Sequence, residues 1–211
     1  MEKDLDIESR RIVGGHVTFA QAHQDLFVRK MLNFKRQGFY LEIGAGEPKQ
    51  SNNTYILESE LGWNGFSLDI DSKIVEDYNL ARKNLALKQD ATNFDYASEF
   101  RKRSFPKQID YLSLDIDPAE ITYQALLKLP HTEYRFSIIT YEHDNYLSGS
   151  EWMNKSRAFW LELGYIRVVS NVKCRERDFE DWYVDPYVIS EEIYKPFVAE
   201  NIECAEIFVS K

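Results

Sequence analysis

Phe39-Tyr40-Leu41-Glu42-Ile43-Gly44-Ala45-Gly46 is the stretch that decides the fold. Its largely apolar first half predicts a short buried strand over residues 39–43, and its glycines predict a tight turn directly afterwards. A segment rich in helix-capping residues follows, and then a second strand-like run, Gly65-Phe66-Ser67-Leu68-Asp69-Ile70. A strand, a helix and another strand form the repeating unit of parallel α/β sheets.

The same alternation continues along the rest of the chain. Further strands are expected over residues 85–89, 109–115, 136–141, 165–173 and 179–184. Helices are expected over residues 22–36, 51–62, 74–83, 96–102, 119–129 and 151–163. The pattern predicts an α/β protein with a doubly wound, mostly parallel seven-stranded sheet and helices on both faces.

Length and charge limit the class of protein. The 211 residues fit one domain, and their 35 acidic and 26 basic side chains give a formal net charge of −9. No apolar run approaches the roughly 18 residues of a membrane span, and the charged N-terminus lacks the apolar centre of a signal peptide. We therefore expect a cytoplasmic protein with no membrane span. The acidic balance also predicts no nucleic-acid partner, because phosphate backbones bind to basic surfaces.

Acidic residues stand at the carboxyl ends of five consecutive predicted strands. In doubly wound sheets, ligands bind beyond these ends, so the residues there are the candidates for a functional site. They are Glu42 after the first strand, Asp69 and Asp71 after the second, Asp90 after the third, Asp115 and Asp117 after the fourth, and Glu142, His143 and Asp144 after the fifth.

The glycine turn after the first strand favours a nucleotide-like ligand, because glycine lets backbone amides approach it closely. A dinucleotide would need a third glycine in the GxGxxG pattern, and Lys49 stands at that place. An adenosyl cofactor without a pyrophosphate needs a tight turn, an acid about 20 residues on for the ribose hydroxyls, and a polar contact for the adenine amine. The turn at Gly44 and Gly46, Asp69 and Asp90 meet these needs in that order.

Five segments resemble the FkbM-type methyltransferases, which have the Rossmann-like class I fold and depend on S-adenosylmethionine. They are QDLFV (24–28), GFYLEIGAGEPKQSNNTYILESELGWNGFSLDID (38–71), DYLSLDIDPAE (110–120), ITYEHDNY (139–146) and FEDWYVDP (179–186). One departure is Asp117-Pro118, where members of the family often carry Glu-Gly. The resemblance covers residues 21–186 as the core, which leaves an N-terminal extension over 1–20 and a C-terminal helix and strand over 187–211.

The resemblance implies S-adenosyl-L-methionine as the cofactor and assigns contacts to it. Glu42, Gly44 and Gly46 would contact the methionyl part, Asp69 the ribose, Asp90 the adenine, and Asp115 the surroundings of the sulfonium. Asn53, Ile70 and Ala91 complete the expected set of cofactor-binding residues.

The acceptor of the methyl group is expected to be an oxygen. Enzymes that methylate base amines commonly carry an Asp/Asn-Pro-Pro-aromatic run after the fourth strand, and this chain has Asp115-Ile116-Asp117-Pro118 there. Together with the acidic charge, this predicts O-methylation of a sugar, a glycan or another hydroxylated small molecule. Two rivals are a cofactor-binding protein of the same fold without activity and a nicotinamide-dependent oxidoreductase.

Three roles are open for the residues after the fifth strand. His143 is a candidate general base, because an unperturbed histidine titrates near working pH and a hydroxyl needs a base. Alternatively, Asp115, Glu142 and either His143 or Asp144 would bind Mg²⁺ or another divalent ion, which would lower the pKa of the hydroxyl. In the third interpretation these residues are structural, since neighbouring residues of a strand point to opposite faces.

Overall fold

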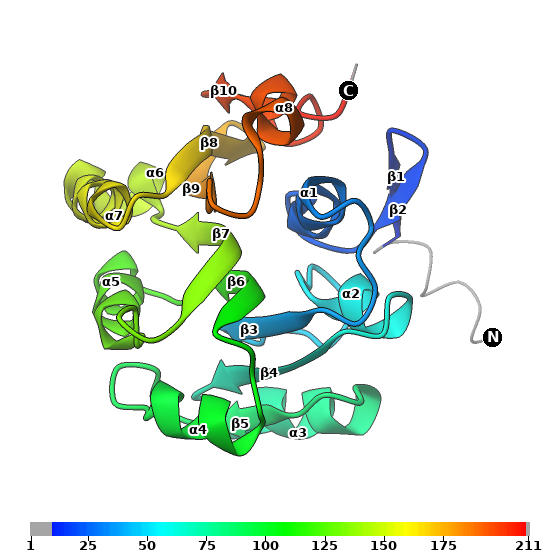
Figure 1. The fold of residues 1–211 in the computed structure, drawn as a ribbon, viewed down its shortest axis with the longest axis vertical. Helices are drawn as coiled ribbons and strands as arrows, with labels where there is room; N and C mark the ends of the chain where they lie inside the picture. The colour runs from blue at the N-terminus through cyan, green and yellow to red at the C-terminus, as the bar shows by residue number, and fades with distance from the viewer. Residues whose placement is uncertain (1–9, 210–211) are drawn as a thin grey trace.

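A central sheet of eight strands organises the protein, which the computed structural model describes over residues 10–209 (Figure 1). Its strands are β3 (Phe39–Ile43), β4 (Asn64–Asp69), β5 (Ala86–Lys88), β6 (Gln108–Leu114), β7 (Arg135–Glu142), β8 (Ile166–Cys174), β9 (Arg177–Val184) and β10 (Ala199–Glu200). Their order is β10-β8-β9-β7-β6-β3-β4-β5. The strands from β7 to β5 are parallel, whereas β9 runs antiparallel to both β7 and β8.

This topology confirms the predicted doubly wound α/β class and corrects the strand count from seven to eight. The additional strand, β10, has two residues and pairs in parallel with β8 at the edge of the sheet. The chain adds β4 and β5 on one side of β3 and then returns to add β6 on its other side. The order of strands in the sheet therefore reverses between β3 and β6, which are neighbours although two strands separate them in sequence. The carboxyl ends of these two strands therefore meet at the topological switch point, where such sheets bind ligands.

Helices cover both faces of the sheet (Figure 1). The helices α1 (Gln24–Met31), α2 (Tyr55–Ser59) and α3 (Ser72–Ala81) pack on one face. The opposite face carries α4 (Tyr96–Lys102), α5 (Ala119–Lys128) and α7 (Ser150–Glu162), whose aromatic and aliphatic side chains form a second core. Shorter helices are α6 (Asn145–Ser148), α8 (Glu191–Tyr194) and the 3-10 helix η1 (Lys195–Phe197).

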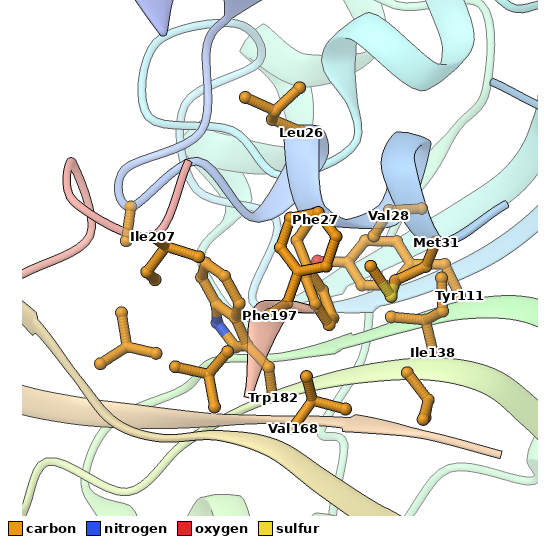
Figure 2. Packing of buried hydrophobic residues seen from close by; sticks show 14 of the residues in the cluster. Leu26, Phe27, Val28, Met31, Tyr111, Ile138, Val168, Trp182, Phe197 and Ile207 are labelled. Atoms are coloured by element: carbon orange, nitrogen blue, oxygen red, sulfur yellow. The ribbon is translucent and has the colours of Figure 1, made fainter. Parts of the chain in front are cut away.

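The first core lies between α1 and the strands β8 and β9 (Figure 2). Phe27 of α1 points toward Trp182 of β9, with ring centroids 4.7 Å apart, and Val28, Met31 and Val168 of β8 belong to the same cluster. Phe197 of η1 enters the same cluster. The C-terminal segment thus covers the edge of the sheet beside α1 and fixes the β8–β9 hairpin.

An N-terminal hairpin, β1 (Arg11–Val13) and β2 (His16–Thr18), stands apart from the main sheet, in the segment predicted as an extension over residues 1–20. Residues 1–9 of that segment lie outside the described residues. The hairpin is tied to α1 because Thr18 donates a hydrogen bond to the buried Asp25 carboxylate and Phe19 N donates another at 2.9 Å. Its strand β1 begins at Arg11, whose guanidinium donates to the carbonyl of Gln21 at 2.6 Å.

Candidate functional site

The turn after β3 is built around Gly44. Its φ is 94°, a conformation that favours glycine, and a Cβ atom there would lie 1.8 Å from the carbonyl oxygen of Asp115. Backbone hydrogen bonds fix the turn on both sides. Gly44 N donates to Leu68 O at 2.9 Å, and Asp115 N donates to Ile43 O at 2.9 Å. The ends of β3, β4 and β6 therefore form one tightly joined rim.

A cavity of about 770 Å³ opens over this rim, within the size range of small-molecule sites. All nine residues predicted to bind the cofactor line it: Glu42, Gly44, Gly46, Asn53, Asp69, Ile70, Asp90, Ala91 and Asp115. We call this space the first cavity. Residues from the ends of four strands, far apart in sequence, are thus brought to one open cavity.

Asp69 and Asp90 present carboxylates to the first cavity from the ends of β4 and β5. Asp69 accepts hydrogen bonds from Gly46 N at 3.3 Å and Asp71 N at 2.9 Å, whereas the cap of α3 is supplied by Asp71. Asp90 accepts from the hydroxyl and amide of Thr92, at 2.7 Å and 2.9 Å, and these bonds lower the pKa of its carboxyl. Both groups are oriented by the loops that contain them.

Glu42 and Asn53 lie deeper in the same wall and are buried. The Oε2 atom of Glu42 accepts hydrogen bonds from Ser67, Tyr78 and Thr54 at 2.6, 3.1 and 3.1 Å. Burial raises the pKa of Glu42, and the nearby Arg82 guanidinium opposes this shift. The Nδ2 atom of Asn53 donates to Ser113 Oγ at 2.9 Å, while its Oδ1 atom has no partner among the described residues. An unpartnered buried acceptor in a cavity wall is a binding group for a ligand N–H.

Two hydrogen-bonded pairs of carboxyl groups connect this cavity with a second one. Glu142 donates to Asp115, and Asp144 donates to Asp117. Burial and the neighbouring carboxylate raise the pKa of Glu142 well above its ordinary value. Burial, the hydrogen bond to Asp117 and the charges of Asp117 and Asp115 raise the pKa of Asp144 to about 7. Because Asp115 and Asp117 line the first cavity and Glu142 and Asp144 line the second, each pair has one member in each wall.

The second cavity has a volume of about 480 Å³ and shares Gln21 and Ser51 with the first. Its remaining lining residues come from the N-terminal hairpin, the end of β7, α6 and the β8–β9 turn: Arg11, Glu142, Asp144, Tyr146, Cys174, Arg175, Arg177 and Phe179. The sequence analysis did not identify its arginines, because nothing in their local sequence indicates that the β8–β9 turn meets β1. Arg175 and Glu176 have φ values of 55° and 66° in a tight hairpin turn, a conformation that their residue types do not predict from sequence.

His143 lies outside both cavities. Its side chain is fully buried, and its Nδ1 atom accepts a hydrogen bond from Asn145 N at 3.2 Å. Burial alone would raise the pKa of Asp181, but hydrogen bonds from Arg157 and the nearby His143 ring lower it. His143 is thus turned toward Asp181, while Glu142 faces the second cavity, as expected for neighbouring residues at the end of a strand. This placement argues against the predicted role of His143 as the general base.

The predicted metal site is also corrected. Asp115 and Glu142 are hydrogen-bonded to each other, and His143 does not approach them as a third ligand. Across residues 10–209, no group of three or more His, Cys, Asp or Glu side chains has an arrangement that could hold a metal ion. A divalent ion is therefore not supported at this site.

Comparisons with known proteins bear on the fold. No family model matches the sequence, and no curated protein is similar to it, so the resemblance to the FkbM type stays a prediction. Solved structures do match. A Clostridium thermocellum protein, provisionally described as an rRNA-methylase, has a TM-score of 0.53 and 18% identity over 78% of this chain and 95% of its own. The Dnmt2 methyltransferase of S. pombe has a TM-score of 0.52 and 15% identity over 71% of this chain and 49% of its own.

These matches correct the prediction of a small-molecule or glycan partner and no nucleic acid, which was wrong. A protein with this fold is described as acting on rRNA, and the net charge of −9 is an average over the chain that ignores the local field at the site. No helix in the described part of the chain is both long and apolar enough to cross a bilayer. The sheet order, the ligand cavity at the switch point and the structural matches agree: the protein has the Rossmann-like fold of class I S-adenosylmethionine-dependent methyltransferases.

Proposed function

We propose that the protein is an S-adenosylmethionine-dependent methyltransferase that methylates a hydroxyl oxygen of a nucleic acid. The observation that carries the proposal is the convergence of nine residues, chosen from the sequence as cofactor contacts, on one cavity at the switch point. The FkbM-type resemblance and the class I fold support the same cofactor. The nucleic-acid acceptor is supported by the description of the Clostridium thermocellum protein.

The residues of the first cavity fit the adenosyl part of the cofactor. We assign Asp69 to the ribose diol, because its carboxylate lies at the end of the strand after the glycine turn, where adenosyl ligands place the ribose. Asp90 and Ala91 lie at the end of β5 and are assigned to the adenine. Gly44 and Gly46 leave room for the ligand to approach the backbone of the turn.

The methionyl part is assigned to Glu42 and Asn53. An ammonium group needs buried acceptors, and the Oδ1 atom of Asn53 is a buried acceptor without a partner among the described residues. Glu42 is held in the same wall by Ser67, Tyr78 and Thr54. A cationic ligand favours the ionised form of Glu42, whose pKa burial raises.

Methyl transfer to a hydroxyl needs the acceptor oxygen aligned with the methyl group and a base that removes the hydroxyl proton. When bound, S-adenosylmethionine would supply an electrophilic methyl group, which passes to the acceptor oxygen as the S–C bond breaks and S-adenosylhomocysteine leaves. The hydroxyl must lose its proton, and we assign this proton to the Asp144 carboxylate, which lines the second cavity and has a pKa of about 7. A base with a pKa near working pH is the most effective one. Asp115 and Glu142, predicted as catalytic, line the first and the second cavity respectively and are hydrogen-bonded to each other.

The test measures first the binding of the cofactor and then the transfer of its methyl group to RNA. Calorimetry should show that S-adenosylmethionine and S-adenosylhomocysteine bind and that NAD does not. Transfer of a tritiated methyl group to RNA should then be detected at physiological salt. Binding of NAD without either adenosyl ligand would replace the proposal by the oxidoreductase rival. Cofactor binding with no transfer to RNA, DNA or small hydroxylated acceptors would favour a protein of this fold without activity.

A further inference from the structure

The second cavity has a positively charged side that the methyl-transfer chemistry does not use. Arg11, Arg175 and Arg177 line it, and all three side chains are exposed. Within residues 10–209, none of the three guanidinium groups forms an ion pair with a carboxylate. Three such groups around one cavity suit an anionic ligand, because guanidinium N–H groups match the oxygens of a phosphate.

The positions of these arginines are determined by the fold. Arg175 and Glu176 form the turn between β8 and β9, with φ values of 55° and 66°. Such turns favour Asn and Gly, since a larger side chain at positive φ is strained. The turn therefore does not explain an arginine at position 175. Across the cavity, Arg11 is held at the carbonyl of Gln21, a residue that lines both cavities.

The second cavity is also lined by acidic groups. These are Glu142 and Asp144, which are joined by their carboxyl pairs to the wall of the first cavity. A ligand that fits both kinds of group has an anionic part for the arginines and a proton-donating part for the carboxyls. A ribonucleotide has both, because its phosphates flank a ribose with a 2′-hydroxyl.

An aromatic ring borders the same space. Tyr146 of α6 is 45% exposed, and the guanidinium carbon of Arg177 lies 5.4 Å from the centre of its ring. Proteins that bind single-stranded nucleic acid combine cationic groups for the backbone with aromatic rings on which bases stack. Tyr146 and Arg177 provide both elements side by side.

We propose that the second cavity is the acceptor site and binds RNA, with Arg11, Arg175 and Arg177 holding backbone phosphates while a ribose hydroxyl faces Asp144. This inference rests on the proposed function and adds to it the residues that select the acceptor. It also explains how a chain with a charge of −9 binds a polyanion: contacts with the phosphates are few and local. Three phosphate contacts with single-stranded RNA predict a salt slope of about −2 in log K against log salt.

The test measures binding of a short, fluorescently labelled, mixed-sequence RNA by anisotropy over a series of salt concentrations. We expect Arg175→Ala and Arg177→Ala each to weaken binding by about tenfold and to make the salt slope shallower by about 0.7. The matched control is Arg36→Ala, which removes an exposed arginine just before β3, at the opposite end of that strand from the site. It should leave both quantities unchanged.

Three outcomes are decisive. If the wild type binds S-adenosylhomocysteine but both cavity variants bind RNA as it does, the inference is overturned and the proposed function stands. If the wild type fails to bind S-adenosylhomocysteine, the proposed function fails, whatever the arginines do. Competition by a nucleoside 5′-phosphate as effective as by the RNA itself would overturn RNA as the source of the phosphate, whereas much weaker competition supports it.

Discussion

The Nε2 atom of His143 lies 3.4 Å from the Oδ1 atom of Asp181, and both side chains are fully buried. Asp181 is also bound by Arg157, at 2.7 and 2.9 Å, and by the amide of Asn171 at 2.8 Å. His143 therefore belongs to a buried polar network that joins the end of β7 to β9 and α7. Its neighbours on either side, Glu142 and Asp144, face the second cavity instead.

His143→Ala should consequently affect stability more than chemistry. Loss of a buried polar partner costs about 1–3 kcal/mol, which lowers the midpoint of thermal unfolding by roughly 2–4 °C per kcal/mol in a domain of this size. Turnover per folded molecule should change little. The measurement pairs calorimetric unfolding with kcat corrected for the folded fraction. A well-folded variant with turnover reduced by 10²–10⁴-fold, the usual contribution of a general base, would contradict this.

Asp69→Ala should weaken the binding of S-adenosylhomocysteine by roughly 10- to 150-fold, the range for a lost charge-assisted hydrogen bond of about 1.5–3 kcal/mol. Isothermal titration calorimetry checks it. Glu76→Ala is the control, because this exposed carboxylate of α3 lies outside the lining of the first cavity. Equal affinities of the wild type and the Asp69 variant would remove Asp69 from the site.

Asp144→Asn should lower turnover by about 10²–10⁴-fold and leave cofactor affinity nearly unchanged. Asparagine suits this position because Asp144 has a left-handed backbone with φ 44°, which Asn tolerates. In the wild type, turnover should rise with pH through about 7 as the Asp144 carboxyl loses its proton. Glu176→Gln removes a nearby exposed carboxylate that does not line the cavity, and it should keep both the rate and the pH profile. A pH-independent wild-type rate would rule out Asp144 as the base.

Stability should fall as pH rises from about 5 to about 9. Burial raises the pKa values of Asp115, Glu142 and Glu180, the last to about 8, so the folded protein retains protons that the unfolded chain releases near pH 4. The stabilisation from these protons is complete below the unfolded pKa and is lost as pH passes the folded value.

Thermal unfolding across this pH range provides the measurement. Glu180→Gln should flatten the dependence, since glutamine keeps an acceptor for Trp182 Nε1, which donates to Glu180 at 2.7 Å, and cannot ionise. Glu176→Gln should leave the dependence as in the wild type. A midpoint that rises with pH would show that the buried acids are ionised in the folded protein.

The lining of the first cavity could be predicted from sequence because its signals are local. The turn at Gly44 and the acids at positions 69 and 90 each follow directly from a recognisable strand, and parallel strands bring their carboxyl ends together without further information. Strand and helix positions were confirmed for the same reason, with differences of a few residues at their ends.

The lining of the second cavity depends on an arrangement that local sequence does not reveal. Arg11 and Arg175 are 164 positions apart, and only the folded chain brings them to the lining of the same cavity. Sequence spacing also does not indicate which of Glu142, His143 and Asp144 points into the protein core and which line the second cavity. That depends on where β7 ends. Net charge failed as a guide to partners because it does not say where the arginines lie.

Gly44 has a further consequence for how the two cavities are joined. A Cβ atom on this residue would lie 1.8 Å from the Asp115 carbonyl oxygen, so the turn after β3 packs directly against the end of β6. Asp115 is in turn hydrogen-bonded to Glu142 at the end of β7, so the walls of the first and second cavities are linked through one chain of contacts. Arg11, Arg175 and Arg177 line the second cavity from elements outside this chain, the N-terminal hairpin and the β8–β9 turn. A substitution of Gly44 should therefore disturb the walls of both cavities, whereas a substitution of one of these arginines should leave the first cavity intact.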